Sequence, residues 1–196
     1  LDATGRIATA LAKTTVTVDG HPAPLLYVSA TQIGAIVPYS ISSSQPRVVV
    51  TYNGLASPAA SVTAAPAAPA LFTIDSSGSG QAAALNQDGS LNGPFNPAGK
   101  GEVITVFGTG EGNTNPGGID GQIATAGNPR PLLAVSAAVG GVPASVLYAA
   151  AAPGQVAGMF QVNFRVPSEA PPGLAVTVTV TVGANTSPKG VTVALQ

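Results

Sequence analysis

The sequence predicts an all-β protein built from two tandem immunoglobulin-like β-sandwiches. Three observations support this fold class. Val, Thr, Gly and Pro are abundant, whereas the helix-favouring residues Glu, Lys, Arg and Met are scarce. Short stretches of alternating apolar and polar residues are separated by turns that contain Gly or Pro, as in small sandwiches. Finally, one block of the sequence occurs twice, which indicates a duplicated unit.

The duplication is visible in three blocks that follow one another in the same order. VDGHPAPLLY at 18–27 matches VGGVPASVLY at 139–148, an offset of 139 − 18 = 121. The later pairs of matching residues have offsets of 129 and then 130, so the second copy carries 129 − 121 = 8 extra residues around 150–158. At the offset of 129, Gln32-Ile33 corresponds to Gln161-Val162, and Val37-Pro38 corresponds to Val166-Pro167. At the offset of 130, Val50-Thr51 corresponds to Val180-Thr181, and Ser57-Pro58 corresponds to Ser187-Pro188.

Each copy is expected to be a series of short strands. In the first copy we expect strands at 14–18, 24–28, 32–37, 47–52 and 61–65. Asp19-Gly20 and Asn53-Gly54 are typical of type I′ hairpin turns between them. In the second copy we expect strands at 103–107, 133–139, 145–149, 160–166, 174–182 and 190–195. The run AVTVTVTV predicts a strand with one packed face and one polar face.

These elements divide the chain into an incomplete first sandwich at 1–68, a connecting hairpin segment at 69–100 and a second sandwich at 101–196. The Pro- and Ala-rich stretch AAPAAPA at 64–70 is expected to be a stiff connector. In the hairpin segment, 72–74 and 82–85 are the expected strands, and Asp88-Gly89 is an expected turn. We expect this segment to pack beside the second sandwich or to bridge the two.

The first copy is expected to lack its opening strand. The second copy begins with the clear strand GEVITVFGTG at 101–110, and an equivalent 121 residues earlier would fall before Leu1. A sheet without this strand exposes backbone groups and part of its core. Three sources remain open for the strand: a chain that extends upstream, the central hairpin, or a neighbouring molecule that donates it.

The composition excludes several classes of function. Only 8% of the residues are charged, with 7 Lys and Arg, 8 Asp and Glu and a net charge of -1, although 45% are hydrophobic. Seven scattered cations do not form the basic patch that nucleic-acid binding requires. No apolar run reaches the ~18 residues of a membrane span, and the absence of Cys excludes disulfides and thiolate chemistry.

No residue pattern predicts catalysis or a cofactor. His21, the single histidine, is expected in an exposed turn, and Ser42–Ser44 lack a nucleophile motif. The glycine-rich stretch at 108–112 is followed by NTNPGG, which cannot begin the helix of a dinucleotide site. Tyr27 and Tyr148 are expected to be equivalent core aromatics.

One weak candidate for a calcium site exists in the segment NQDGSLN. Its oxygen-bearing residues alternate around a glycine, and they are Asn86, Asp88, Ser90 and Asn92. Only one of the four is charged, and the distal Glu of calcium loops is absent. A hairpin turn at Asp88-Gly89 accounts for the same residues and is the preferred interpretation.

Three segments of the chain resemble a C-terminal domain family of secreted acidobacterial proteins with tandem immunoglobulin-like (IPT/TIG-like) repeats. They are DGHPAPLLYVSATQIGAIVP, ALFTIDSSGSGQAAALNQDGSLNGPFNPAGKGEVITVFGTGEG and GGVPASVLY. The resemblance implies a surface or secreted location and an immunoglobulin-like fold, and it implies no catalytic residue. In that family a strand similar to GEVITVFGTG usually precedes both copies. Ala35 stands where the second copy has Phe164, so the two cores are not expected to be equally filled.

The expected function is therefore that of a non-enzymatic, extracellular structural or adhesion module. Near-zero net charge and Val/Thr/Ala-rich strands favour association, so the module is expected to self-associate, with the incomplete first sandwich accepting a strand from its neighbour. The alternative is an accessory domain of a larger secreted protein that binds a polysaccharide or a protein. We expect no cofactor, no nucleic acid and no membrane span.

Overall fold

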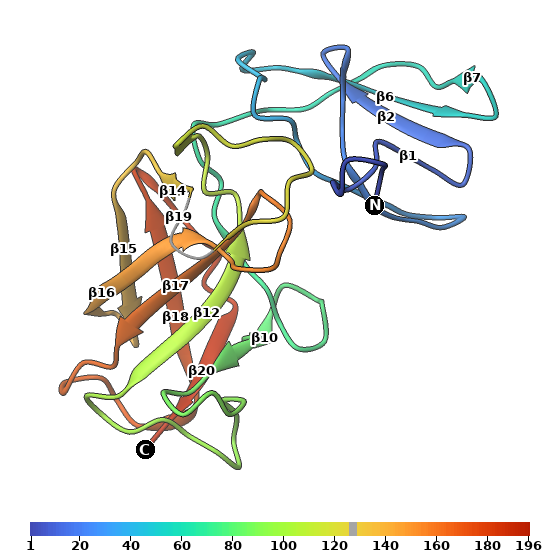
Figure 1. Ribbon diagram of the computed structural model, residues 1–196. Helices are drawn as coiled ribbons and strands as arrows, with labels where there is room; N and C mark the ends of the chain where they lie inside the picture. The colour runs from blue at the N-terminus through green and yellow to red at the C-terminus, as the bar shows by residue number, and fades with distance from the viewer. Residues whose placement is uncertain (126–128) are drawn as a thin grey trace.

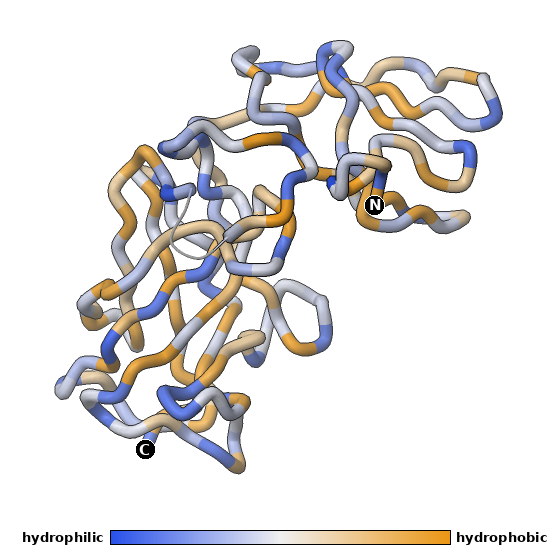
Figure 2. Tube along the Cα trace, in the orientation of Figure 1, coloured by the Kyte–Doolittle hydropathy of each residue, from blue (hydrophilic) through white to orange (hydrophobic). Residues whose placement is uncertain are grey.

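The computed structural model describes residues 1–125 and 129–196, and its regular secondary structure is all-β, as the sequence predicts (Figure 1). Strands β1–β8 form a first unit and strands β9–β20 form a second unit. Within the described ranges no helix is long and apolar enough to cross a bilayer. In Figure 2, hydrophobic residues run along the strands of both units, while most connecting turns are hydrophilic.

The first unit contains two small sheets. One has the strand order β1-β2-β6-β7, with β3 also paired to β2 and β8 to β6, and the other is the pair β4-β5. The strands are β1 (Ala10–Leu11), β2 (Thr14–Val18), β3 (His21–Pro22), β4 (Leu25–Val28), β5 (Ile33–Ala35), β6 (Arg47–Tyr52), β7 (Leu55–Ala56) and β8 (Ala60–Ser61). Its buried core is small and consists of Val16, Val18, Ala23 and Leu25.

The second unit has a longer sheet path and a larger core. Its main strand order is β10-β20-β18-β15-β16-β17-β12-β11, and β13 pairs separately with β14. The strands are β9 (Ala70–Leu71), β10 (Gly80–Gln81), β11 (Ala84–Leu85), β12 (Val103–Thr109), β13 (Thr114–Asn115), β14 (Arg130–Pro131), β15 (Val135–Val139), β16 (Val142–Ala151), β17 (Met159–Arg165), β18 (Gly173–Val182), β19 (Asn185–Thr186) and β20 (Val191–Leu195).

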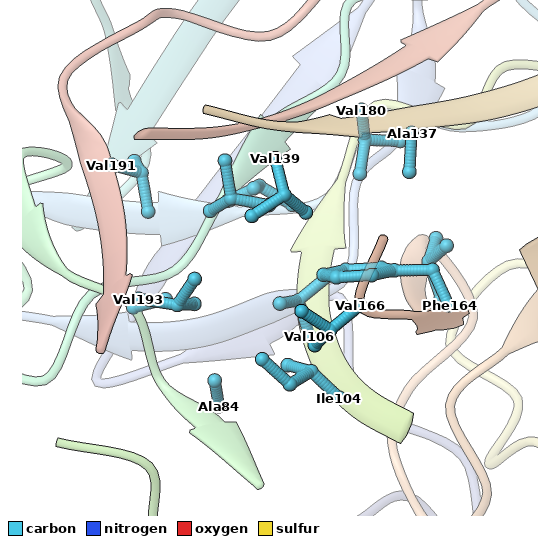
Figure 3. Close-up of a cluster of buried hydrophobic side chains, with 14 of the residues drawn as sticks. Ala84, Ile104, Val106, Ala137, Val139, Phe164, Val166, Val180, Val191 and Val193 are labelled. Carbon is cyan, nitrogen blue, oxygen red and sulfur yellow. The ribbon is translucent and has the colours of Figure 1, made fainter. Parts of the chain in front are cut away.

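The core of the second unit is filled by alternate residues of its long strands (Figure 3). In β18 the valines are buried and the intervening threonines are partly exposed, as the alternating sequence predicts. In β17 the buried positions include both phenylalanines, Phe160 and Phe164. Figure 3 shows Phe164 beside Ile104, Val106 and Val166 in this core.

The two units repeat the same strand register. In the first unit Leu25 pairs with Ala35 and Tyr27 with Gly34, with a bulge between Leu25 and Tyr27. The second unit pairs 146 with 164 and 148 with 163, again with a bulge between the two pairs. These positions are related by offsets of 121 on one strand and 129 on the other, the same offsets that the sequence contains. The duplication therefore extends to individual cross-strand pairs.

Pro24 and the unpaired edge of β5 account for the short strands β3, β4 and β5. Strand β16 is continuous, whereas its counterpart is divided into β3 and β4, where Pro24 stands in place of Ser145 and offers no N–H to a ladder. The strand expected at 32–37 is observed only as β5. Its second-unit counterpart β17 is held on both sides, by β16 and by β12.

The segment 69–100 belongs to the second unit. Strands β9 and β11 both pair with β12, and β10 pairs in parallel with β20. Residues 72–74 lie opposite 81–83, which forms the expected hairpin. Leu71, Ala82, Ala84 and Ala98 are part of the second unit's core. Because these residues pair and pack within the second unit, the central hairpin does not add a strand to the sheets of the first unit.

Candidate functional site

The edge of β5 is open where the corresponding edge of β17 is covered. Strand β12 pairs with β17 along seven residue pairs, from Val103 opposite Arg165 to Thr109 opposite Met159. Beyond them, the Val166 N–H donates to the Glu102 carbonyl at 2.8 Å. Across the described part of the chain, β5 pairs only with β4, and the N–H and C=O of Val37, the counterpart of Val166, have no hydrogen-bond partner.

Side chains at this edge are exposed in the first unit and buried in the second. Val37 is 61% exposed, whereas its counterpart Val166 is 1% exposed. Ala35 is exposed, whereas Phe164 is fully buried. Burying a valine side chain contributes roughly 1.5–3 kcal/mol. This edge of the first unit therefore exposes apolar surface whose burial would be favourable.

An apolar groove of about 880 Å³ opens beside the edge. It lies between the first unit, the connector and the loop that follows β12. Its first-unit wall includes Val18, Leu26, Ala35, Val37, Ile41 and Val48, and the opposite side includes residues 62–68, Phe72, residues 109–113, Gly158 and Met159. Its titratable side chains are Tyr39 and Glu111.

The glycine-rich loop at 108–112 holds the connector. The Ala68 N–H donates to the Gly110 carbonyl at 2.9 Å. Gly110 and Gly112 have φ angles of +84° and +75°, and a Cβ on either would overlap the backbone of the connector. The glycines therefore permit a close approach of two backbone segments, and this loop does not begin a helix.

Glu111 connects the two units from a buried position. Its side chain is 1% exposed, and the Tyr39 hydroxyl donates to Glu111 Oε1 at 3.2 Å. Among the residues that the structure describes, Oε2 has no hydrogen-bond partner. Burial raises the pKa of the Glu111 carboxyl to about 7, and the hydrogen bond from Tyr39 opposes that shift. Burial and the nearby Glu111 carboxylate also raise the pKa of Tyr39. The sequence analysis did not predict the contact between Tyr39 and Glu111. The one feature of the sequence that could have indicated it is the position of Glu111 between Gly110 and Gly112.

Two further contacts place Tyr39 against the second unit. The Tyr39 N–H donates to Asp120 Oδ1 at 2.9 Å. The Tyr39 ring occupies the space in which Gly118 would carry a Cβ. Elsewhere along the boundary, the Ile7 N–H donates to the Gly121 carbonyl at 2.8 Å. The groove is thus continuous with a polar contact between the two units.

His21 lies away from the groove, as an exposed residue of β3. Its Nδ1 is 3.0 Å from Ser40 Oγ, and Ser40 is exposed as well. A Ser–His pair needs an acid that orients the imidazole and a site that excludes water. No cluster of three or more His, Cys, Asp or Glu side chains is found in residues 1–125 and 129–196. Ser42–Ser44 line the groove, without His21.

Tyr27 is not a core residue, contrary to expectation. It is 44% exposed, and its ring covers Gly34, where a Cβ would collide with it. Tyr148 is half-buried, and its hydroxyl lies 3.4 Å from the Ala151 carbonyl oxygen. The ring of Tyr27 therefore lies on the solvent side of the paired strands β4 and β5, where it covers Gly34.

In the calcium candidate, the side chains form a hydrogen-bonded turn. Asn92 is buried and joins the turn to β20: its Nδ2 donates to the Ala194 carbonyl at 2.9 Å, and its Oδ1 accepts from the Ala194 N–H at 2.8 Å. Asn86 Oδ1 accepts from Asn92 Nδ2 at 2.9 Å. Asp88 Oδ1 accepts from the N–H and the hydroxyl of Ser90, and these bonds lower the pKa of Asp88.

We expect calcium to leave the melting temperature unchanged. The amide oxygens of Asn86 and Asn92 already accept hydrogen bonds from protein donors, so binding the ion would require breaking them. Differential scanning fluorimetry with increasing calcium chloride measures this, with magnesium chloride as the ionic-strength control. A rise in melting temperature with calcium alone would contradict the prediction.

Comparison with known proteins identified no relative of the chain. No protein-family model, curated protein or solved structure matches the chain. The groove and the open edge of β5 are therefore interpreted from their own geometry.

Proposed function

We propose that the chain is a non-enzymatic, extracellular structural or adhesion module that associates with neighbouring chains by β-strand addition at its first unit. The open edge of β5 carries this proposal, because an unpaired edge beside exposed apolar side chains is a template for another strand. The extracellular location rests on the resemblance of the sequence to secreted repeat proteins.

The surface chemistry supports association. The net charge is -1 and only 8% of residues are charged, so long-range repulsion between copies is weak. Several large apolar side chains besides Val37 are exposed on both units. They include Leu55 and Tyr52 in the first unit and Leu91, Phe95 and Leu174 in the second.

The chemistry of the groove favours binding over turnover. Its titratable groups are a buried carboxyl and the tyrosine hydroxyl bonded to it. Glu111 Oε2 is buried away from solvent, and Oε1 is occupied by Tyr39. A general base must reach the proton that it abstracts, and this carboxyl is enclosed by the contact between the units.

Self-association should depend on Val37. We expect size-exclusion chromatography with light scattering to show oligomers whose mass rises with concentration, and we expect Val37→Asp to reduce them to monomers, because a charge at the edge opposes burial. Leu174→Asp is the matched control, since Leu174 is 60% exposed but belongs to the second unit.

A monomer at every concentration would contradict the self-association part of the proposal. Equal loss of oligomers in Val37→Asp and Leu174→Asp would show that association does not use the β5 edge. A monomer that binds a polysaccharide or another protein would instead favour an accessory binding domain.

A further inference from the structure

The two units have separate hydrophobic cores. In the described part of the chain, the buried apolar side chains form one cluster in the first unit and another in the second, and the two clusters have no residue in common. The chain passes from the first unit to the second through the connector between β8 and β9. Parts of a chain that share no core can move relative to each other. The contacts at their boundary therefore determine how the units are held together.

The connector is bound at its two ends by different units. The Ala64 N–H donates to the Ser44 carbonyl of the first unit at 3.0 Å. The Ala68 N–H donates to the Gly110 carbonyl of the second unit at 2.9 Å. Rotation of the backbone at 65–66 leaves both hydrogen bonds in place. A hinge at these residues therefore allows the units to separate while each keeps its own fold.

The segment that follows β5 joins the first unit to the second. The Tyr39 hydroxyl donates to Glu111 Oε1 at 3.2 Å. Ile36 lies against Gly158, because a Cβ at Gly158 would be 3.0 Å from the Ile36 side chain. Ile36 and Tyr39 line the groove from the first unit, and Glu111 lines it from the second. Separation of the units would therefore bring water to the Glu111 carboxyl.

Glu111 gains no partner of opposite charge from this contact. Among the residues that the structure describes, Oε2 has no hydrogen-bond partner, and Oε1 accepts from Tyr39. The other charged group bound to Tyr39 is Asp120, a second carboxyl, which accepts the Tyr39 N–H at 2.9 Å. The segments around this contact also carry Arg6 and Arg130, and both are exposed to solvent.

The remaining segments around Glu111 carry no charge. Residues 35–46, 62–70 and 155–159 contain no Asp, Glu, Lys or Arg. An ionised carboxyl that loses its hydration without gaining a cation is unfavourable. Burial accordingly raises the pKa of Glu111 to about 7. Separation of the units restores the hydration of the carboxylate, so ionisation favours the separated form.

We propose that the contact between Tyr39 and Glu111 is a proton-dependent switch between the two units: the contact is closed while Glu111 carries its proton, and ionisation of Glu111 favours an open form in which the units rotate apart at 65–66. Opening moves the two walls of the groove away from each other, so the pH would control the shape of the groove. This inference is independent of the proposed function, because it concerns contacts within one chain.

The size of the effect follows from the two protonation equilibria. In the open form Glu111 is hydrated and should ionise near its ordinary pKa of 4.5, whereas in the closed form its pKa is about 7. The ratio of open to closed chains should therefore rise on the order of a hundredfold between pH 4.5 and 8.

Pulsed dipolar EPR measures this ratio as a distance between the units. The chain has no cysteine, so two introduced cysteines carry spin labels at defined positions. Leu55→Cys in the first unit and Leu91→Cys in the second are exposed positions that do not line the groove. Labelled chains are diluted with an excess of unlabelled chain, so that only distances within one chain are measured. We expect a second distance whose population grows from pH 4.5 to 8.

Two isosteric variants identify the carboxyl that is responsible. Glu111→Gln cannot ionise, so its label-to-label distance should stay the same from pH 4.5 to 8. Asp120→Asn is the matched control, because its side-chain oxygen can still accept the Tyr39 N–H, and it should open as the parent protein does. An unchanged distance in the parent protein, or equal opening in the parent and Glu111→Gln, would overturn the inference.

Amide hydrogen exchange of the unlabelled parent protein gives a test that needs no variant. The Tyr39 and Ile7 N–H groups donate across the boundary between the units. They should exchange together, and faster than the amides at 176–180 in the buried strand β18. Exchange of all these amides at one rate would show that the units separate only when the protein unfolds, and it would overturn the inference.

Discussion

Phe164→Ala should lower the free energy of unfolding of the second unit by about 4 kcal/mol. Phe164 is fully buried near the C-terminal end of β17, between β12 and β16, and it is among the largest side chains of the core. Truncation removes its buried surface and leaves a cavity that the surrounding strands cannot fill, because they are fixed by their ladders. Guanidinium chloride unfolding followed by circular dichroism measures the change.

The duplicated chain provides a matched control for that result. Val166→Ala should cost about 2 kcal/mol, because Val166 is buried, whereas Val37→Ala at the equivalent position should change stability by less than about 0.5 kcal/mol, because Val37 is exposed. The same substitution is thus compared at two positions of one repeat. Equal costs at Val37 and Val166 would mean that the first unit buries its edge in solution.

Raising the pH from 4.5 to about 7 should destabilise the protein by about 3 kcal/mol through Glu111. The folded carboxyl keeps its proton up to about pH 7, whereas the unfolded carboxyl ionises near 4.5. In this window the unfolded state binds fewer protons, so unfolding becomes more favourable as the pH rises. The stabilisation is fully present below 4.5 and is lost as the pH passes through about 7.

Glu111→Gln tests this pH dependence, because the amide keeps the shape of the side chain and cannot ionise. We expect the variant to be more stable than the parent protein at pH 8 and to lose the parent's decline in stability between pH 4.5 and 7. Chemical unfolding at a series of pH values measures both proteins. Glu169→Gln, at an exposed carboxyl whose pKa is lowered by Ser168, should keep the parent's decline. An unchanged decline in Glu111→Gln would contradict the prediction.

The sequence predicted the strands best where alternation and turn signals agree. The alternating valines of β18 are buried as expected, and the Asp19-Gly20 and Asn53-Gly54 turns have the positive φ angles that their residues favour. The predicted strand ends were wrong where a partner strand decides them. Strand β5 ends at Ala35 because, in the described ranges, no strand pairs with its other edge to hold residues 36 and 37. A pattern within one segment cannot show what lies beside it.

The groove was predictable only in outline. The offsets of the repeat indicated that the first copy lacks a strand, and the pair Ala35 and Phe164 indicated an unequal core. Tyr39 and Glu111, which close one end of the groove, are 72 residues apart and carry no common motif. Likewise, Asn92 appeared in the sequence as a calcium candidate, and its role as a bridge to Ala194 depends on a contact across 102 residues.

The sequence by itself determined the all-β class, the two copies and the offsets that relate them, because alternation, turn chemistry and repeat offsets can be read from the chain alone. Only the tertiary structure decided which edge stays open, which polar groups are buried and where the central hairpin packs. Those features depend on which segments pack together and exclude water, and these segments are far apart along the chain. No pattern within a single segment indicates burial of that kind.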